Sequence, residues 1–180
     1  MLSDSEKKIL LRIARQSLEK YFSGEALQHI GRTDLLKENR AAFVTLKKHG
    51  QLRGCIGYIM PTKPLDITVA ELAIEAATRD PRFSPIEAKE LADIAIEISV
   101  MTPLERVYDI NTIVVGKHGL YVKRGFRSGL LLPQVATEWG WDRKKFLEQT
   151  CYKAGIDYTA WKTKDIEIYS FSAEVFGEEQ

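Results

Sequence analysis

One hexapeptide holds the side chains of this sequence that are best suited to chemistry, and its residues are Leu52-Arg53-Gly54-Cys55-Ile56-Gly57. Residues two apart share a face of a regular strand, so the Arg53 guanidinium can lie beside the Cys55 sulfur. A nearby cation favours the thiolate, which is the form of cysteine that acts as a nucleophile or a ligand. The hexapeptide therefore indicates a catalytic or ligand-holding thiol at Cys55, with Arg53 as the group that holds an anion.

The glycines of the hexapeptide need a physical reason, because glycine in a strand costs entropy and offers no side chain for packing. Either the strand bulges, or another backbone or a ligand comes close to Gly54 and Gly57. A ligand at this place makes Gly54, Ile56 and Gly57 candidate binding residues. The alternative for Cys55 is a packed small side chain, since free cysteine is among the most buried residue types. Cys151 lies on an expected helix and is assigned to the core.

Two other segments carry candidate site residues. His118 lies in a Gly-Lys-His-Gly sequence. It can serve as a base for Cys55, or it can occupy a turn with unusual backbone angles. Asp80, Arg82 and Phe83 lie in a loop bounded by prolines. An ion pair that locks this loop is one interpretation, and a carboxylate and guanidinium that face a ligand are the other, since ordered loops often carry function.

The composition argues against several classes of protein. The 26 basic and 25 acidic residues give a net charge of +1, whereas a nucleic-acid binder needs a positive excess. The three histidines and two cysteines have no metal-ligand spacing, so no metal is expected, and no particular cofactor is indicated. No segment suits a signal peptide or a membrane span, so no membrane partner is expected. Two distant cysteines fit reduced thiols and a cytoplasmic location.

Hydrophobic periodicity and breaker residues predict both helices and strands. Helices are expected over residues 3–24, with a capping box of Ser3 and Glu6, and over 33–39, 65–79, 133–140 and 142–155. One hairpin is expected from strands 42–48 and 52–59, and a second from strands 112–115 and 120–123, with its turn at 116–119. Further strands are expected over 93–101, 129–132 and 165–176.

Together these elements predict an α+β protein with two subdomains. The larger subdomain, 1–103 and 164–180, holds an antiparallel sheet flanked by helices and contains both chain ends, so the last strand returns to this sheet. The smaller subdomain, 104–163, is an inserted α+β unit with short strands and frequent glycines. Two lobes of this kind create a cleft between them, which is a preferred place for ligands.

The hexapeptide resembles the hallmark sequence of the AMMECR-type domain family. The family's other sequence blocks are resembled, in chain order, by residues 76–85, 98–103, 116–120, 129–136, 141–142, 153–155 and Trp161. The resemblance therefore covers nearly the whole chain as one AMMECR-type domain. It implies an α+β fold with a larger subdomain from both chain ends and a smaller one between them. It also implies that the side chains of the hexapeptide point toward the cleft.

The resemblance implies no settled activity. Prokaryotic members of the family often occur beside, or fused to, Memo-like and radical-SAM proteins, which implies a shared pathway. We expect a binding or scaffold module for a protein or a small ligand, centred on the cleft. The alternative is an enzyme in which Cys55 is the nucleophile or thiol ligand, Arg53 holds an anion and His118 acts as base.

Overall fold

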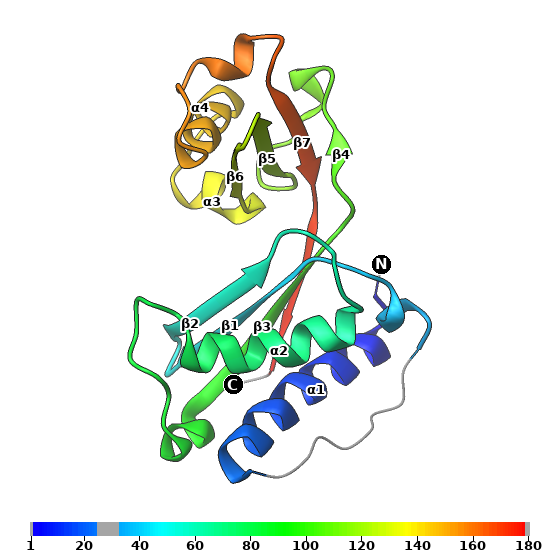
Figure 1. Cartoon of the computed structure of the whole chain (residues 1–180), viewed down its shortest axis with the longest axis vertical. Coiled ribbons are helices and arrows are strands. Elements are labelled where there is room, and N and C mark those ends of the chain that lie inside the picture. Colours follow the sequence, from blue (N-terminus) through cyan, green and yellow to red (C-terminus); the bar gives the residue numbers. More distant parts are fainter. Residues whose placement is uncertain (1, 25–32, 179–180) are drawn as a thin grey trace. The chain divides into compact units, whose positions relative to one another are not determined.

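The chain contains two compact units, each with its own hydrophobic core. The computed structural model describes residues 2–24 and 33–178 (Figure 1). One unit comprises Met1–Val100 with Glu174–Gln180, and the other comprises Met101–Ala173. Both contain helices and antiparallel strand pairs, so the predicted α+β class is confirmed. The insertion expected at 104–163 lies inside the second unit, which extends further at both ends.

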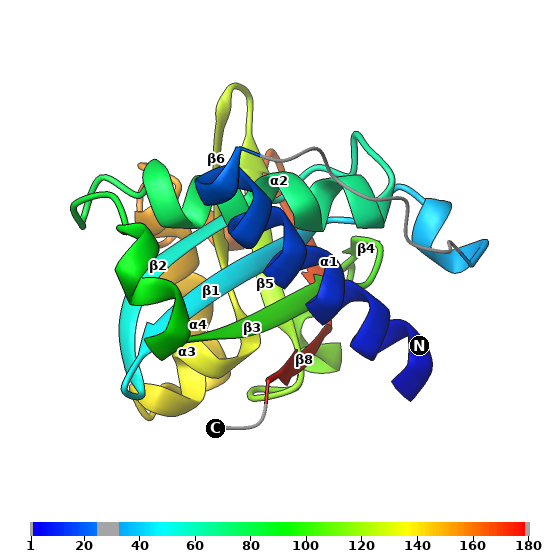
Figure 2. The same cartoon turned by 90° about the horizontal axis from the view of Figure 1, so that it is seen from below.

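The first unit is a sheet with two helices on one face (Figures 1 and 2). Its strands, in spatial order, are β2 (Gln51–Tyr58), β1 (Ala42–Lys48), β3 (Ile94–Met101) and β8 (Ala173–Gly177). Its helices are α1 (Asp4–Ser23), α2 (Leu65–Thr78) and the short 3-10 helices η1 (Leu35–Lys37) and η2 (Ala88–Asp93). The predicted Ser3–Glu6 capping box is present at the start of α1, and Gly24 ends this helix with φ of 77°.

Within the short helix predicted over 33–39, only the three residues of η1 are helical, and they form a 3-10 turn. The backbone at Glu38 is extended and its carbonyl accepts a hydrogen bond from the Leu65 amide at 2.9 Å. Asn39 forms an isolated bridge with Pro64. The backbone groups of residues 38 and 39 thus pair with the segment at the start of α2 and are not available for the hydrogen bonds of a longer helix.

The second unit packs two helices on a sheet of short strands (Figure 1). Its strands, in spatial order, are β4 (Glu105–Arg106), β7 (Glu167–Phe171), β5 (Gly119–Arg124) and β6 (Arg127–Leu131). Its helices are α3 (Pro133–Glu138), α4 (Arg143–Lys153) and the 3-10 helices η3 (Ile110–Thr112) and η4 (Ala160–Lys162). Over the described residues, no helix is long and apolar enough to cross a membrane.

The second predicted hairpin has its turn at a different place. β5 pairs with β6 around Gly125, whose φ is 60°, and not around residues 116–119. The expected strand at 112–115 does not form, because Thr112 belongs to η3 and the Val114 carbonyl accepts bonds from the Lys117 and His118 amides at 3.2 and 2.9 Å. These local turns override the β propensity of this segment.

The last predicted strand, 165–176, forms two strands in two different sheets. β7 belongs to the second unit, and only β8 returns to the first sheet. The break is at Ser172, whose carbonyl accepts from the Thr102 amide at 2.8 Å and whose amide donates to Thr102 Oγ1 at 2.9 Å. These bonds join the two segments that connect the units.

Candidate functional site

Arg53 lies at a bulge in β2, which is an edge strand of the first sheet. Leu46 of β1 is paired with Gly54 and Lys47 with Leu52, so Arg53 has no partner residue on β1. A bulge bends the strand and re-aims the side chain of the extra residue. The alternation of faces expected for a regular strand therefore does not hold at Arg53.

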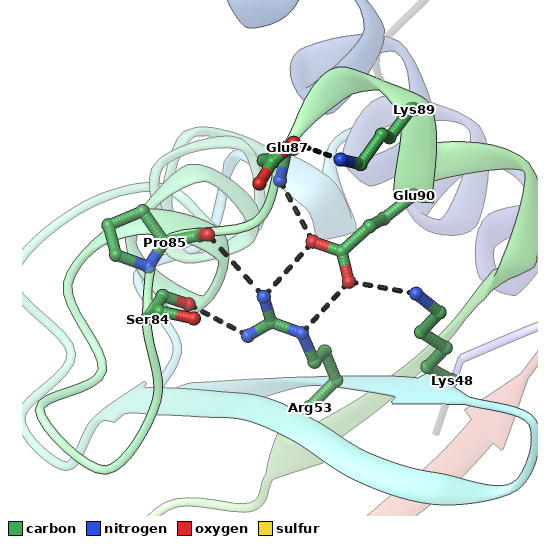
Figure 3. Close-up of polar contacts among 7 residues, drawn as sticks. All are labelled: Lys48, Arg53, Ser84, Pro85, Glu87, Lys89 and Glu90. Carbon is green, nitrogen blue, oxygen red and sulfur yellow. Dashed lines mark hydrogen bonds and ion pairs between the residues drawn. The ribbon is translucent and has the colours of Figure 1, made fainter.

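The Arg53 guanidinium binds Glu90 and the loop before it (Figure 3). Its Nε and Nη2 donate to the two carboxylate oxygens of Glu90 at 3.2 and 3.1 Å, and its Nη1 donates to the Ser84 carbonyl at 2.8 Å. Nη2 also approaches the Pro85 carbonyl at 3.4 Å. The Arg53 side chain is only 15% exposed. Its hydrogen bonds hold η2 and residues 84–85 against β2. In the described parts of the chain, no hydrogen bond or ion pair joins Arg53 to Cys55.

Glu90 is the centre of this cluster. Besides Arg53, it accepts bonds from Lys48 Nζ at 3.0 Å and from the Glu87 amide at 3.0 Å. The hydrogen bond from Arg53, followed by those from Glu87 and Lys48, lowers the pKa of Glu90 to about 2. The carboxylate is therefore ionised at neutral pH and holds η2 against the β1–β2 hairpin.

Cys55 is half-buried, and three of its atoms bond to nearby side chains. The Thr45 hydroxyl, directly across on β1, donates to Cys55 Sγ at 3.2 Å. The Cys55 amide donates to Asp80 Oδ2 at 2.8 Å, and the Cys55 carbonyl accepts from Arg82 Nη2 at 3.3 Å. Asp80 and Arg82 thus occupy the free edge of β2 as a neighbouring strand would, which satisfies its exposed backbone groups.

Asp80 is buried and holds Arg82 in place. Its carboxylate accepts from the Arg82 amide at 3.1 Å, from Nε at 3.0 Å and from Nη2 at 2.7 Å. The hydrogen bond from the Arg82 side chain, together with the bond from the Cys55 amide, holds the pKa of Asp80 well below its usual range. A bidentate pair of this kind fixes the guanidinium in one orientation.

The cation beside Cys55 is Arg82 and not Arg53. The pKa of Arg82 is raised, above all by its bond to Asp80 and also by a charge interaction and a side-chain hydrogen bond with Cys55. The Arg82 side chain is 55% exposed, whereas that of Asp80 is 2% exposed. Arg82 therefore presents a charged, oriented and accessible group next to a thiol.

The loop that carries Arg82 is anchored at both ends. The Phe83 amide donates to the Asp80 carbonyl at 3.2 Å, and the Ile86 amide donates to the Ala77 carbonyl at 2.8 Å. The Phe83 ring centroid lies 5.5 Å from Arg82 Cζ, which is a cation–π distance. The ion pair that locks the loop is present, and the exposed part of Arg82 leaves ligand binding open as a second role.

Both glycines of the hexapeptide have packing reasons within the first unit. A Cβ at Gly54 would lie 2.1 Å from the Ala76 carbonyl oxygen of α2, and a Cβ at Gly57 would lie 2.0 Å from Phe43 Cδ1. Of the alternatives drawn from the sequence, the bulge and the close backbone approach are therefore both present. A ligand-binding role for Gly54, Gly57 and Ile56 stays a prediction.

The remaining candidates lie in the second unit. His118 Nδ1 accepts from the Val114 amide at 3.2 Å, so this histidine stabilises a loop, and its role as base for Cys55 stays a prediction. Cys151 is fully buried in the second core, and burial raises the pKa of its thiol. Across the described residues, no group of three His, Cys, Asp or Glu side chains could hold a metal ion.

Thr45 and Glu90 were not identified from the sequence. Pairing the predicted hairpin strands residue by residue across the 49–50 turn would place Thr45 opposite Gly54, and only the bulge at Arg53 moves it opposite Cys55. Glu90 gives no local signal, because its contact with Arg53 joins residues 37 positions apart.

The chain belongs to the AMMECR1 family, whose model matches residues 11–176. It is 45% identical over 186 residues to a protein of Methanothermobacter thermautotrophicus, a match that covers 99% of this chain and 97% of that protein. It is 46% identical over 189 residues to a protein of Methanopyrus kandleri, a match that covers 99% of this chain and 91% of that protein. The crystal structure of an uncharacterised protein from Pyrococcus horikoshii matches with a TM-score of 0.89 and 39% identity, over 99% of this chain and 94% of that chain.

Proposed function

We propose that this chain is a binding module for a small acidic ligand, a carboxylate or a phosphate, held at Arg82 beside Cys55. The observation that carries the proposal is the half-exposed Arg82 guanidinium fixed by buried Asp80. An arginine whose orientation is already fixed loses little freedom when an anion binds, so more of the interaction energy appears as affinity. Bidentate recognition of carboxylate and phosphate is the task to which arginine is best suited.

The surroundings of Arg82 support the same function. Thr45 supplies a hydroxyl and Cys55 a thiol on the same face of the sheet, since the two residues are paired across β1 and β2. Arg53 is bound to Glu90 and holds the loop, so we assign it a positioning role in place of the anion-holding role expected from the sequence. The cleft expected between the subdomains stays a prediction, and the proposal does not depend on it.

The direct test is affinity selection of small molecules from a cell extract, read by mass spectrometry. The native chain is compared with Arg82→Ala and with Arg79→Ala, an exposed arginine three residues earlier that pairs only with Glu75 among the described residues. We expect acidic molecules that are retained by the native chain and by Arg79→Ala and are lost from Arg82→Ala. Equal retention by all three proteins would contradict the proposal.

The second candidate function is an enzyme with Cys55 as nucleophile. Two contacts favour it, the Thr45 hydroxyl that donates to Sγ at 3.2 Å and the Arg82 guanidinium beside Cys55, because a hydrogen-bond donor and a cation are common neighbours of a nucleophilic cysteine. Its test is trapping of a covalent intermediate on Cys55 by intact-protein mass spectrometry in extract, with Cys55→Ser as control. A mass increase present in both proteins would contradict this second function.

We also propose that the ligand belongs to a pathway shared with Memo-like and radical-SAM proteins, and that the chain acts in the cytoplasm. The first proposal is supported only by the family resemblance. The second is supported by the two unpaired cysteines, Cys55 and Cys151, which suit a reducing compartment. Co-purification with Memo-like proteins from a prokaryotic source tests the first proposal. Cell fractionation tests the second.

A further inference from the structure

A pocket of about 370 Å³ lies in the second unit beside the turn between β5 and β6. Its lining residues are Arg124, Phe126, Arg127, Ile156 and Asp157. The volume is within the range of small-molecule sites. The lining combines an aromatic ring, an aliphatic side chain and groups of both charges, so it suits a ligand that is flat and carries both an anion and hydrogen-bond donors.

Phe126 is fully exposed at the tip of the hairpin. An aromatic ring with no packing of its own presents a flat face, and base–aromatic stacking is a common use of such a face. Ile156 lines the same pocket and supplies an apolar contact beside the ring. The apolar part of the pocket is therefore suited to a planar ring system.

Arg127 supplies the cation of the pocket. Its Nη1 donates to the Gly155 carbonyl at 2.7 Å, which fixes the direction of the side chain. Its other guanidinium nitrogens have no partner within the described ranges. Arg124, in contrast, is paired with Asp165, through Nε and Nη2 at 2.7 Å each. An anionic group of a ligand would therefore bind Arg127.

Asp157 supplies a fixed carboxylate. Its Oδ1 accepts from the Thr159 amide at 2.7 Å and from the Thr159 hydroxyl. These bonds hold the pKa of Asp157 below its ordinary value, so the group is ionised at neutral pH. Oδ2 accepts no hydrogen bond from the residues that the structure describes. The carboxylate can therefore accept bonds from ligand N–H groups.

The local charge of this unit differs from that of the whole chain. Residues 101–173 contain eleven lysines and arginines against eight aspartates and glutamates. The total charge of the chain is near neutral and argued against nucleic-acid binding. The second unit taken alone nevertheless has a net positive charge. A phosphate-bearing ligand is compatible with this local excess.

We propose that this pocket binds a guanine nucleotide. The base stacks on Phe126, its adjacent N1–H and N2–H groups donate to Asp157, and its phosphate pairs with Arg127. Adenine lacks this pair of adjacent donors, so it binds more weakly. The same chemistry applies to a free nucleotide and to a guanosine within single-stranded RNA. This site is independent of the Arg82–Cys55 site in the first unit.

The test is titration calorimetry of the full chain with GMP, AMP, guanosine and a short single-stranded RNA that contains guanosine. We expect GMP to bind at least about fivefold more tightly than AMP or guanosine, because each lacks one of the proposed contacts. Phe126→Ala is expected to weaken GMP binding at least about fivefold, from the usual effect of removing a stacking ring. Asp157→Asn is expected to abolish the preference for GMP over AMP.

Two substitutions serve as controls in the same unit. Tyr108→Ala removes another exposed ring and Lys144→Ala removes another exposed cation, and both are expected to leave GMP binding unchanged. Tighter binding of the RNA than of GMP would identify a strand as the ligand, and the reverse would identify the free nucleotide. The proposal is overturned if neither ligand binds at millimolar concentration, or if Phe126→Ala and Asp157→Asn bind GMP as the native chain does.

Discussion

At the level of single residues, the candidate site depends on one buried carboxylate. Asp80 accepts bonds from the Cys55 amide and from Arg82, and it thereby sets both the edge of β2 and the direction of the guanidinium. Arg53 is closer to Cys55 in sequence, yet the bulge places it in a different cluster with Glu90. Proximity along the strand therefore did not identify the cation that lies beside Cys55.

Gly54 is predicted to be irreplaceable for steric reasons. In Gly54→Ala, the new Cβ would lie 2.1 Å from the Ala76 carbonyl oxygen, a backbone atom that cannot rotate away. We expect a loss of about 3 kcal/mol in the free energy of unfolding, at the upper end for overpacking. The measurement is urea unfolding followed by circular dichroism.

Gly125→Ala is the matched control for Gly54→Ala. Gly125 has φ of 60° and open space around its Cα, so this substitution costs only backbone strain, about 1 kcal/mol. If Gly54→Ala proves no less stable than Gly125→Ala, the close packing of β2 on α2 is not what requires glycine at position 54.

Glu90 is predicted to make stability depend on pH in the acid range. Its pKa is about 2 in the folded chain against an ordinary value of 4.5, so its contribution is complete above pH 4.5 and is lost as pH falls through about 2. The native chain should therefore exceed Glu90→Gln in free energy of unfolding by a constant amount above about pH 5. This difference should shrink between pH 4.5 and 2.

Urea unfolding at a series of pH values measures this difference. Glu138→Gln, at an exposed glutamate that forms no ion pair in the described structure, is the control and should match the native chain throughout. A difference between the native chain and Glu90→Gln that is equally large at pH 2 and pH 7 would show that Glu90 acts without its charge.

At the level of elements, the helices and strands that depend on local signals, such as caps, turn residues and hydrophobic periodicity, could be predicted from the sequence. The capping box at Ser3, the β1–β2 hairpin, α2 and α4 all form as expected. The strand expected at 112–115 did not form, because local turns occupy this segment. The single strand expected at 165–176 is divided, because its two parts pair in different sheets. In the site, Cys55, Asp80 and Arg82 were named in advance, whereas contacts between distant residues, such as Arg53 with Glu90, could not be.

The loop from Asp80 to Glu90 is predicted to depend on Arg53 for its order. Arg53→Ala removes bonds to Glu90 and to the Ser84 carbonyl, and bonds that involve charged groups contribute about 1.5–3 kcal/mol each. Amide hydrogen exchange at residues 83–91 should therefore accelerate at least about tenfold. Exchange in α1 should change less.

Arg40→Ala is a suitable control for Arg53→Ala. Arg40 is similarly buried, with 18% of its side chain exposed, and it pairs with Glu38, only two residues away. Its removal should leave exchange at 83–91 unchanged. Acceleration by both substitutions to the same extent would indicate general destabilisation and would contradict the specific role of Arg53.

At the level of the whole molecule, the chain builds two cores from separate sets of residues. The first unit buries side chains of α1, α2, β1 and β3, and the second buries those of β5, β7 and α4. The two proposed sites follow this division, with Arg82 and Cys55 in the first unit and Phe126 in the second. Each unit therefore has a core and a candidate binding site of its own.

Leu147→Ala is predicted to affect the two units unequally. Leu147 is fully buried in the core of the second unit, and truncating such a leucine costs about 2–5 kcal/mol. Native-state hydrogen exchange should show a large loss of protection in β5 and β7 and a smaller loss in β1 and β3. An equal loss in all four strands would mean that the two units unfold as one.

The most direct test of Arg82 as the anion-binding group is the rate ratio of Cys55 alkylation by iodoacetate and iodoacetamide at low ionic strength. The ratio cancels the thiolate fraction and reports attraction of an anion to the thiol, and Cys151→Ser removes the background thiol. We expect Arg82→Ala to lower the ratio about fivefold, the effect of one charge near a partly exposed thiol, and Arg53→Ala to leave it unchanged. A ratio unaffected by Arg82→Ala, or lowered only by Arg53→Ala, would contradict the assignment of Arg82 as the anion-binding group.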